Sequence, residues 1–296
     1  MRGSDYLRLG ALAALWGASF LFMRIAAPAF GAINTAFFRV ALGFIGLLFM
    51  LTLLKRPLNF NGKFGPSLIL GIINSGVPFL MYCLAAKWLP AGYSAILNAT
   101  TPLMGALLGI TFFHEAISAK KRVGMTLGFC GIIAITAVGE LPSPRAAAAG
   151  VACCLIATAC YALAGFLTRK WIAGRGGLDA ALVALGSQMG ASLFLLPFFI
   201  GNIAVRPAID WLQPAAWASV IALGTLCTVL AYILYFRLIA DIGPLRSLTV
   251  TFLIPPFALL WGYLALGETV SVGYLAGACA VCIGVWMVVS PDKTSR

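Results

Sequence analysis

Ten apolar runs dominate the sequence, separated by glycine, proline or charged residues. A helix needs about 20 apolar residues to cross the hydrocarbon core of a bilayer. Ten helices of that length use about 200 residues, so no large soluble domain is expected beside them. The runs predict ten transmembrane helices, at about residues 7–25, 33–54, 65–86, 92–113, 121–139, 147–169, 179–200, 213–237, 244–266 and 270–290.

Composition excludes a water-soluble globule. The chain is 62% hydrophobic and 9% charged, whereas soluble domains contain about 25% charged residues. The net charge of +12 does not indicate a nucleic-acid partner, because Lys and Arg occur in short clusters between the apolar runs. With a single histidine and no HExxH motif, the sequence predicts no enzyme, no metal site and no cofactor.

The connecting segments carry the orientation signal. If both termini are cytoplasmic, fifteen of the 20 Lys and Arg residues fall on the cytoplasmic side. The other side has Arg24, Lys87, Arg145 and Arg206, and Arg39 lies inside the second predicted helix. Because cytoplasmic loops carry an excess of Lys and Arg, this bias predicts a multi-pass protein with both termini in the cytoplasm.

A long stretch of the sequence repeats. When the chain is shifted by 153 positions, residues 70–137 fall on residues 223–290 without a gap. The first predicted helix also matches the sixth, at a shift of 145. Two unrelated apolar helices share some Leu and Gly, but not Pro, Glu and Tyr in one register. The matched pairs include Tyr82 and Tyr235, Pro102 and Pro255, Glu115 and Glu268, Trp16 and Tyr161, Gly17 and Ala162, and Arg24 and Arg169.

The repeat divides the chain into two halves, residues 1–139 and 147–290, with five predicted helices in each. Because five is odd, the second half must enter the membrane from the opposite side. The sequence thus predicts an all-α membrane protein of ten transmembrane helices, arranged as two inverted-topology five-helix repeats. Inverted repeats are the architecture of many alternating-access transporters.

Several motifs together resemble a known family. They are Leu15-Trp16-Gly17 in the first predicted helix, Arg39 in the second, and the His114-Glu115 and Gly267-Glu268 ends of the fourth and ninth. In this order they resemble the EamA family of the drug/metabolite transporter superfamily, over essentially the whole chain. The resemblance implies a ten-helix bundle in a bacterial inner (plasma) membrane that exports or exchanges small metabolites such as amino acids. One departure is that a shift of 149 matches Arg39 with Gln188, so this arginine has no twin.

Four prolines lie inside the predicted helices: Pro78, Pro102, Pro255 and Pro256. A proline removes one backbone hydrogen bond and frees the carbonyl about one turn before it. Interrupted helices at matching places in two inverted repeats point to a binding site. We therefore expect helix breaks at these prolines, and the alternative is that they only bend packing helices.

Polar and aromatic side chains recur at helical spacing near these prolines. A cavity lined by aromatic rings and a few amide and hydroxyl groups suits a small amphipathic solute. The alternatives are hydroxyls that bond within their own helices and rings placed at the membrane interface. The predicted substrate-binding residues are Trp16, Asn74, Tyr82, Asn98, Tyr161, Thr228, Tyr232 and Thr251.

Arg39 is a charge inside the second predicted helix. Intramembrane charges are costly and face the interior of the bundle. Two roles fit this position: Arg39 binds a substrate carboxylate in a bidentate pair, or it pairs structurally with Glu268. Glu115 and Glu268, at matching helix ends, are themselves predicted to be gate or loop-ordering residues.

These features predict a secondary transporter, an exporter or facilitator of small amphipathic metabolites such as amino acids. Strong proton coupling is not expected, since no Asp or Glu lies in the middle third of a predicted helix. The alternatives are a nucleotide-sugar or phosphate-type antiporter, which would need paired central bases, and a multidrug efflux carrier, which would need an acid in the first helix. The expected partners are a small-molecule substrate and the lipid bilayer, without nucleic acid, and the protein is expected to be a monomer or weak oligomer.

Overall fold

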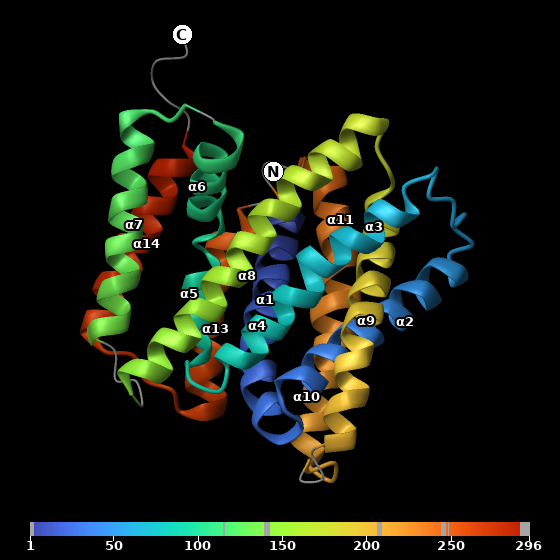
Figure 1. Ribbon diagram of the computed structural model, residues 1–296, viewed down its shortest axis with the longest axis horizontal. Coiled ribbons are helices and arrows are strands. Elements are labelled where there is room, and N and C mark those ends of the chain that lie inside the picture. Colours follow the sequence, from blue (N-terminus) through green and yellow to red (C-terminus); the bar gives the residue numbers. More distant parts are fainter. Residues whose placement is uncertain are drawn as a thin grey trace.

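The computed structural model describes residues 3–114, 116–138, 143–205, 209–243, 247 and 249–290, and every regular element in these ranges is helical (Figure 1). Within these ranges, eight helices are long and apolar enough to cross a membrane, and one more apolar helix is shorter. The predicted all-helical, multi-pass membrane protein is thereby confirmed. The elements are α1 (Gly3–Phe30), α2 (Ala32–Leu53), α3 (Phe64–Gly71), η1 (Ile72–Gly76), α4 (Val77–Ala85), α5 (Ala91–Asn98), α6 (Thr101–Phe113), α7 (Ala119–Val138), α8 (Pro144–Trp171), η2 (Ala173–Arg175), α9 (Ala180–Val205), α10 (Pro214–Gly224), η3 (Thr225–Leu230), α11 (Ala231–Ile242), α13 (Val250–Leu266) and α14 (Val272–Val289).

The first helix is longer than predicted and lies in the middle of the bundle (Figure 1). It continues through Pro28 to Phe30, and Gly31 then turns the chain directly into α2. Gly31 has a φ of 82°, a conformation that side chains with a Cβ rarely adopt. Because α1 extends past residue 25 to Phe30, Arg24 lies more than one turn from the end of the helix.

Two long helices contain a π-helical turn that the sequence analysis did not predict. The turn η1 separates α3 from α4, and η3 separates α10 from α11. In η3 the Thr228 hydroxyl donates to the carbonyl of Leu223, 2.8 Å away and five residues earlier. A shift of 153 carries residue 72 onto residue 225, so the two turns begin at matched positions. Such π-turns are frequent at functional sites.

The predicted proline breaks have different outcomes in the two halves. The chain leaves the α-helix after Asn98, and α6 begins at Thr101 with Pro102 in its first turn, where no intrahelical N–H is needed. The Thr101 hydroxyl donates to the Asn98 carbonyl at 2.8 Å, so this carbonyl has a partner. The predicted break at Pro255 and Pro256 is wrong, because α13 continues through both. Membrane helices tolerate proline where neighbouring groups satisfy the freed carbonyls.

Helices α7 and α14 pack against each other through glycines, side by side at one edge of the bundle (Figure 1). A Cβ atom added to Gly124 would lie 2.8 Å from the Gly284 carbonyl oxygen, and one added to Gly131 would lie 2.8 Å from that of Gly277. Small residues let membrane helices approach until their backbones touch. Since 124 opposes 284 and 131 opposes 277, the two helices are antiparallel.

We call two residues counterparts when they match at a shift of 145, for residues of α1 and α2, or of 153, for residues 70–137. The packing contacts between the halves come in pairs that are related in this way. Gly277 is the counterpart of Gly124, and Gly284 is that of Gly131. Gly124 contacts Gly284, and the counterparts of these two residues, Gly277 and Gly131, contact each other. The same holds for three further sets of contacts, in which two residues touch across the halves and their counterparts also touch. Further such contacts are Gly71 with Ser187 and Gly224 with Leu42, Gly76 with Ala191 and Gly46 with Val229, and Gly17 with Ala258 and Gly105 with Ala162.

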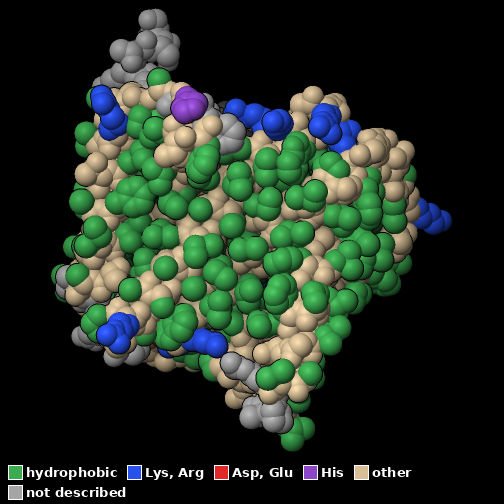
Figure 2. Space-filling model, in the orientation of Figure 1, with side chains coloured by type: hydrophobic (Ala, Val, Ile, Leu, Met, Phe, Trp, Pro, Cys, Tyr) green, Lys and Arg blue, Asp and Glu red, His purple; other side chains and the backbone are tan. Residues whose placement is uncertain are grey.

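The outer surface fits a lipid environment. On the face drawn in Figure 2, hydrophobic side chains cover the middle of the molecule, and Lys and Arg side chains lie along its margins. Large apolar side chains are exposed along several helices, including Phe49 on α2 and Leu264 on α13. In water such a surface would be unfavourable, whereas lipid tails are as apolar as these side chains.

Candidate functional site

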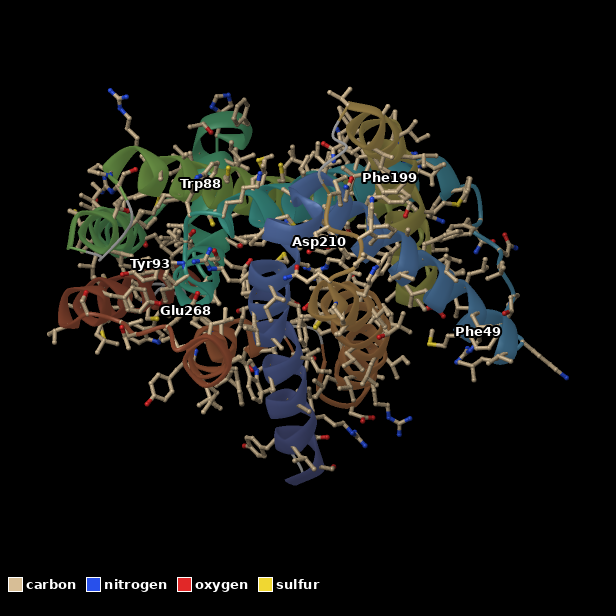
Figure 3. All side chains as sticks on the ribbon, turned by 90° about the horizontal axis from the view of Figure 1, so that it is seen from below. Phe49, Trp88, Tyr93, Phe199, Asp210 and Glu268 are labelled. Carbon is tan, nitrogen blue, oxygen red and sulfur yellow. The ribbon has the colours of Figure 1, made fainter. Side chains whose placement is uncertain are left out.

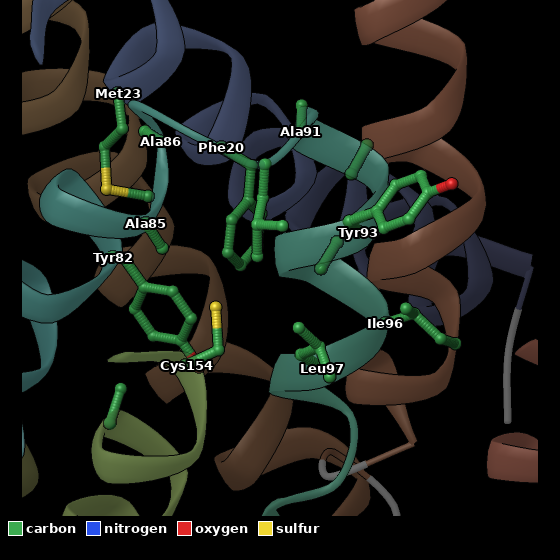
Figure 4. Packing of buried hydrophobic residues seen from close by; sticks show 14 of the residues in the cluster. Phe20, Met23, Tyr82, Ala85, Ala86, Ala91, Tyr93, Ile96, Leu97 and Cys154 are labelled. Atoms are coloured by element: carbon green, nitrogen blue, oxygen red, sulfur yellow. The ribbon is translucent and has the colours of Figure 1, made fainter. Parts of the chain in front are cut away.

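Tyr82 on α4 belongs to the largest buried cluster, where it contacts residues of α1, α5 and α8 (Figure 4). Its hydroxyl donates to Asn98 Oδ1 at 2.9 Å. The edge of the Phe20 ring meets the Tyr82 ring at a centroid distance of 5.4 Å, and the Tyr161 ring stacks on it at 6.2 Å. The structure therefore brings three predicted substrate-binding residues together: Tyr82, Asn98 and Tyr161.

A second aromatic pair joins Trp16 on α1 to Tyr235 on α11, with ring centroids 5.3 Å apart. Trp16 is the counterpart of Tyr161, and Tyr235 is the counterpart of Tyr82. The two aromatic pairs thus obey the same reciprocal relation as the glycine contacts. Each pair takes one ring from residues 1–139 and one from residues 147–290.

Arg39 is buried in the interior of the bundle, with 5% of its surface exposed. Its Nη1 donates to the Met23 sulfur at 3.5 Å, and its guanidinium carbon lies 3.7 Å above the centre of the Phe79 ring. Its Nε has no hydrogen-bond partner. The contacts of its guanidinium are thus with α1, through Met23, and with α4, through Phe79.

The predicted pair between Arg39 and Glu268 is wrong, because Glu268 pairs with Arg24. Arg24 Nε lies 3.1 Å from Glu268 Oε1, and Arg24 Nη1 donates to the Ala86 carbonyl at 2.6 Å. Glu268 Oε2 accepts the Ala91 N–H at 2.9 Å, so this carboxylate also caps the start of α5, beside which it lies in Figure 3. These bonds tie α1, α5 and the end of α13 together.

Gln188 on α9, which the sequence matches with Arg39 at a shift of 149, was not predicted as a site residue. It is fully buried; its Nε2 donates to Ser75 Oγ in η1 at 3.2 Å, and its Oε1 has no partner. A Cβ atom added to Gly43 would lie 3.2 Å from that Oε1 and 2.8 Å from Thr228 Cγ2. A shift of 145 makes Gln188 the counterpart of Gly43, so the packing fits this register and not the shift of 149. An amide inside an apolar run was the sequence signal.

The other predicted residues lie around this cluster or beyond it. Tyr232 is half-buried on α11, where its ring stacks on that of Phe236 with centroids 5.5 Å apart. Asn74 is half-buried in η1, and Thr251 is half-buried in the first turn of α13. Pro78 is buried in the first turn of α4. The predicted gate residue Glu115 lies outside the described residues.

The comparisons with known proteins agree on one family. The model of the EamA-like transporter family matches residues 6–137 and again residues 148–290. The "Uncharacterized transporter YoaV" of Bacillus subtilis is 21% identical over 92% of both chains. The "Probable terminal-alkyne amino-acid exporter" of Streptantibioticus cattleyicolor is 22% identical, over 92% of this chain and 89% of its own. The "Probable amino-acid metabolite efflux pump" of Salmonella typhimurium is 21% identical over 95% of this chain and 93% of its own.

A solved crystal structure has the same fold. It aligns with 98% of this chain and 97% of its own length, with a TM-score of 0.61 and 15% sequence identity. At this identity the likeness concerns the fold alone.

Proposed function

Because the chain belongs to the EamA-like transporter family, we propose that it is a secondary transporter that exports small amphipathic metabolites, such as amino acids, by alternating access. Membership confirms the resemblance seen in the sequence and places the chain among membrane transporters, not enzymes. The substrate class and the mechanism are our proposal, and the following observations support them.

The observation that carries the mechanism is the reciprocity of contacts between the halves. Contacts of this kind arise when two like units face each other across a two-fold axis. Since α7 and α14 are antiparallel, this axis runs across the helices, which supports ten transmembrane helices in two inverted repeats, residues 1–139 and 147–290. The two separate family matches also support this division. Two such halves can exchange conformations and so open the site to each side in turn.

The state described here has one end tied by Arg24, Glu268 and Ala91. The excess of Lys and Arg in the other set of loops supports an orientation with both termini in the cytoplasm of a bacterial cell. In this orientation the tied end faces outward, and export requires these bonds to break. The proposed location is the inner (plasma) membrane.

The substrate class rests on the chemistry of the interior. Tyr82, Tyr161 and Trp16 offer aromatic faces, while Asn98 and Gln188 offer amide groups. Aromatic walls with a few polar groups bind small solutes that have an apolar body and a polar end. Two relatives bear names that refer to amino-acid export, which supports the same class.

Uptake into liposomes tests the proposal. Purified protein is reconstituted and screened against amino acids, amines and cationic drugs, with empty liposomes and a Trp16→Ala/Tyr161→Ala double variant as controls. We expect saturable uptake of one or more amino acids that is lost in the double variant. Uptake restricted to cationic drugs would overturn the substrate class, and no uptake of any compound would overturn the transport proposal.

The energy source and the orientation have separate tests. We expect exchange or facilitated flux, so a pH gradient at clamped membrane potential leaves the rate unchanged.

A single cysteine at Ser143, in a variant without native cysteines, should react with membrane-impermeant maleimide from outside intact cells. Labelling of this cysteine only after lysis would overturn the orientation.

A further inference from the structure

We propose that Arg39 and Gln188 are the two polar ends of the substrate site, where Arg39 binds the carboxylate of the substrate and Gln188 Oε1 accepts an N–H from it. This inference rests on the proposed transport function and adds the residues and chemistry that select the substrate.

Arg39 carries a buried charge without a counter-ion among the described residues. The described carboxylates have partners elsewhere: Asp5 and Asp241 pair with Arg8, Glu268 pairs with Arg24, Asp179 accepts the Ala181 N–H, and Asp210 accepts the Leu212 N–H. The partners of the Arg39 guanidinium are a thioether and a phenyl ring, and its Nε donor is unused. An unpaired charge is among the most costly groups to bury. A carboxylate that accepts from the guanidinium would remove this cost.

Gln188 supplies the opposite chemistry. Its Nε2 is held by Ser75, which fixes the amide so that Oε1 is the free end. An amide oxygen without a partner accepts a hydrogen bond from an amine or amide N–H and cannot bind a carboxylate. A buried acceptor left unpaired costs free energy that a donor on the substrate would recover.

Both groups lie beside the same stretch of α2. Gly43 follows Arg39 by one helical turn, which rises about 5.4 Å. Gly43 packs closely against Gln188 Oε1 and the Thr228 methyl group, since a Cβ atom at position 43 would lie 3.2 Å from the first and 2.8 Å from the second. The proposed site therefore lies along this turn of α2.

The repeat supports a ligand role over a structural one. The counterpart of Arg39 is Ala184, and the counterpart of Gln188 is Gly43. The packing contacts recur in both halves, whereas these two polar groups do not. These two groups therefore differ from the repeated packing contacts, and they make this part of the interior positive at Arg39 and hydrogen-bond accepting at Gln188 Oε1.

Ligand-induced stabilisation tests the assignment directly. Purified protein is heated with L-leucine, with L-leucinamide, which lacks the carboxylate, and with 4-methylpentanoate, which lacks the amine; the same three forms are used for phenylalanine. We expect the wild type to be stabilised most by the amino acid. Arg39→Gln should bind it about 10- to 100-fold more weakly and lose the preference over the amide, as expected for one charge-assisted hydrogen bond. Gln188→Leu should lose the preference for the amino acid over the amine-free acid.

Arg145→Gln, an exposed arginine at the start of α8, is the matched control and should bind as the wild type does. Equal binding of acid and amide by the wild type, or unchanged selectivity in Arg39→Gln, would overturn the assignment. Failure of every carboxylate to stabilise the wild type would overturn it as well. Liposome uptake of amines without any carboxylate preference would keep the transport function and reject only this site.

Discussion

Arg24 and Glu268 form an ion pair between α1 and the segment that follows α13, with 3.1 Å between Nε and Oε1. The same carboxylate accepts the Ala91 N–H, and the same guanidinium holds the Ala86 carbonyl. Both side chains are partly buried, so water screens the pair less than it screens a pair at the surface. One carboxylate and one guanidinium therefore fix the relative positions of three helix ends.

Glu268→Gln should loosen this end of the bundle. The substitution keeps the shape but removes the charge, and we expect a loss of about 1 kcal/mol of stability, in the range measured for caps and partly exposed pairs. A cysteine at Phe20, one turn further inside α1, should then react faster with impermeant maleimide. Arg8→Gln removes an ion pair at the start of α1 and is the control; equal acceleration in both variants would contradict a local role for Glu268.

Gly131→Ala should destabilise the protein, whereas Gly165→Ala should not. The new Cβ at position 131 would lie 2.8 Å from backbone atoms of Gly277 and Val281, which cannot move aside easily. We expect a cost of about 1–3 kcal/mol from overpacking. Gly165 has no atom within 4 Å of such a Cβ, and alanine is the better helix former. Thermal unfolding in detergent measures both, and equal melting temperatures would refute the close packing of α7 and α14.

Tyr82→Phe should weaken transport by about twofold to tenfold, the effect of losing one hydrogen bond of roughly 0.5–1.5 kcal/mol. The ring contacts with Phe20 and Tyr161 remain, and only the bond to Asn98 is lost. A double-mutant cycle with Asn98→Ala measures the coupling, and Tyr263→Phe, on the exposed surface, is the control. Additive effects of the two changes would show that the hydroxyl and the amide act separately.

Arg39→Met should leave the empty protein as stable as the wild type or more so. A buried charge without a counter-ion is costly, and an apolar side chain of similar length removes that cost. Arg24→Met breaks an ion pair and should lower the melting temperature. If Arg39→Met melts below Arg24→Met, Arg39 has a structural role and the ligand assignment is contradicted.

The sequence predicts the helices well because the bilayer requires long apolar runs. It does not predict η1 or η3, since one extra residue in a turn leaves the apolar pattern of the run unchanged. It also misses the unbroken course of α13 through Pro255, which depends on how neighbouring groups satisfy the freed carbonyls.

The candidate site shows the same division. Polar and aromatic residues at helical spacing predicted Tyr82, Asn98 and Tyr161 one helix at a time, and the packing of α4, α5 and α8 decides that they touch. The partner of Glu268 could not be predicted, because it depends on where α1 ends: an end at residue 25 puts Arg24 at the very end of the helix, whereas with the end at Phe30 it lies inside the helix and faces Glu268. Gln188 required the packing register between α2 and α9, which a single sequence does not contain.

The reciprocal contacts have an energetic consequence for the whole molecule. If each half buries nearly the same atoms against the other, a conformer in which they trade places buries nearly the same atoms again. The two conformers then differ little in free energy, and the balance between them is set by groups without a twin. A single substitution at such a group could change the side of the membrane to which the favoured conformer opens, without altering the fold.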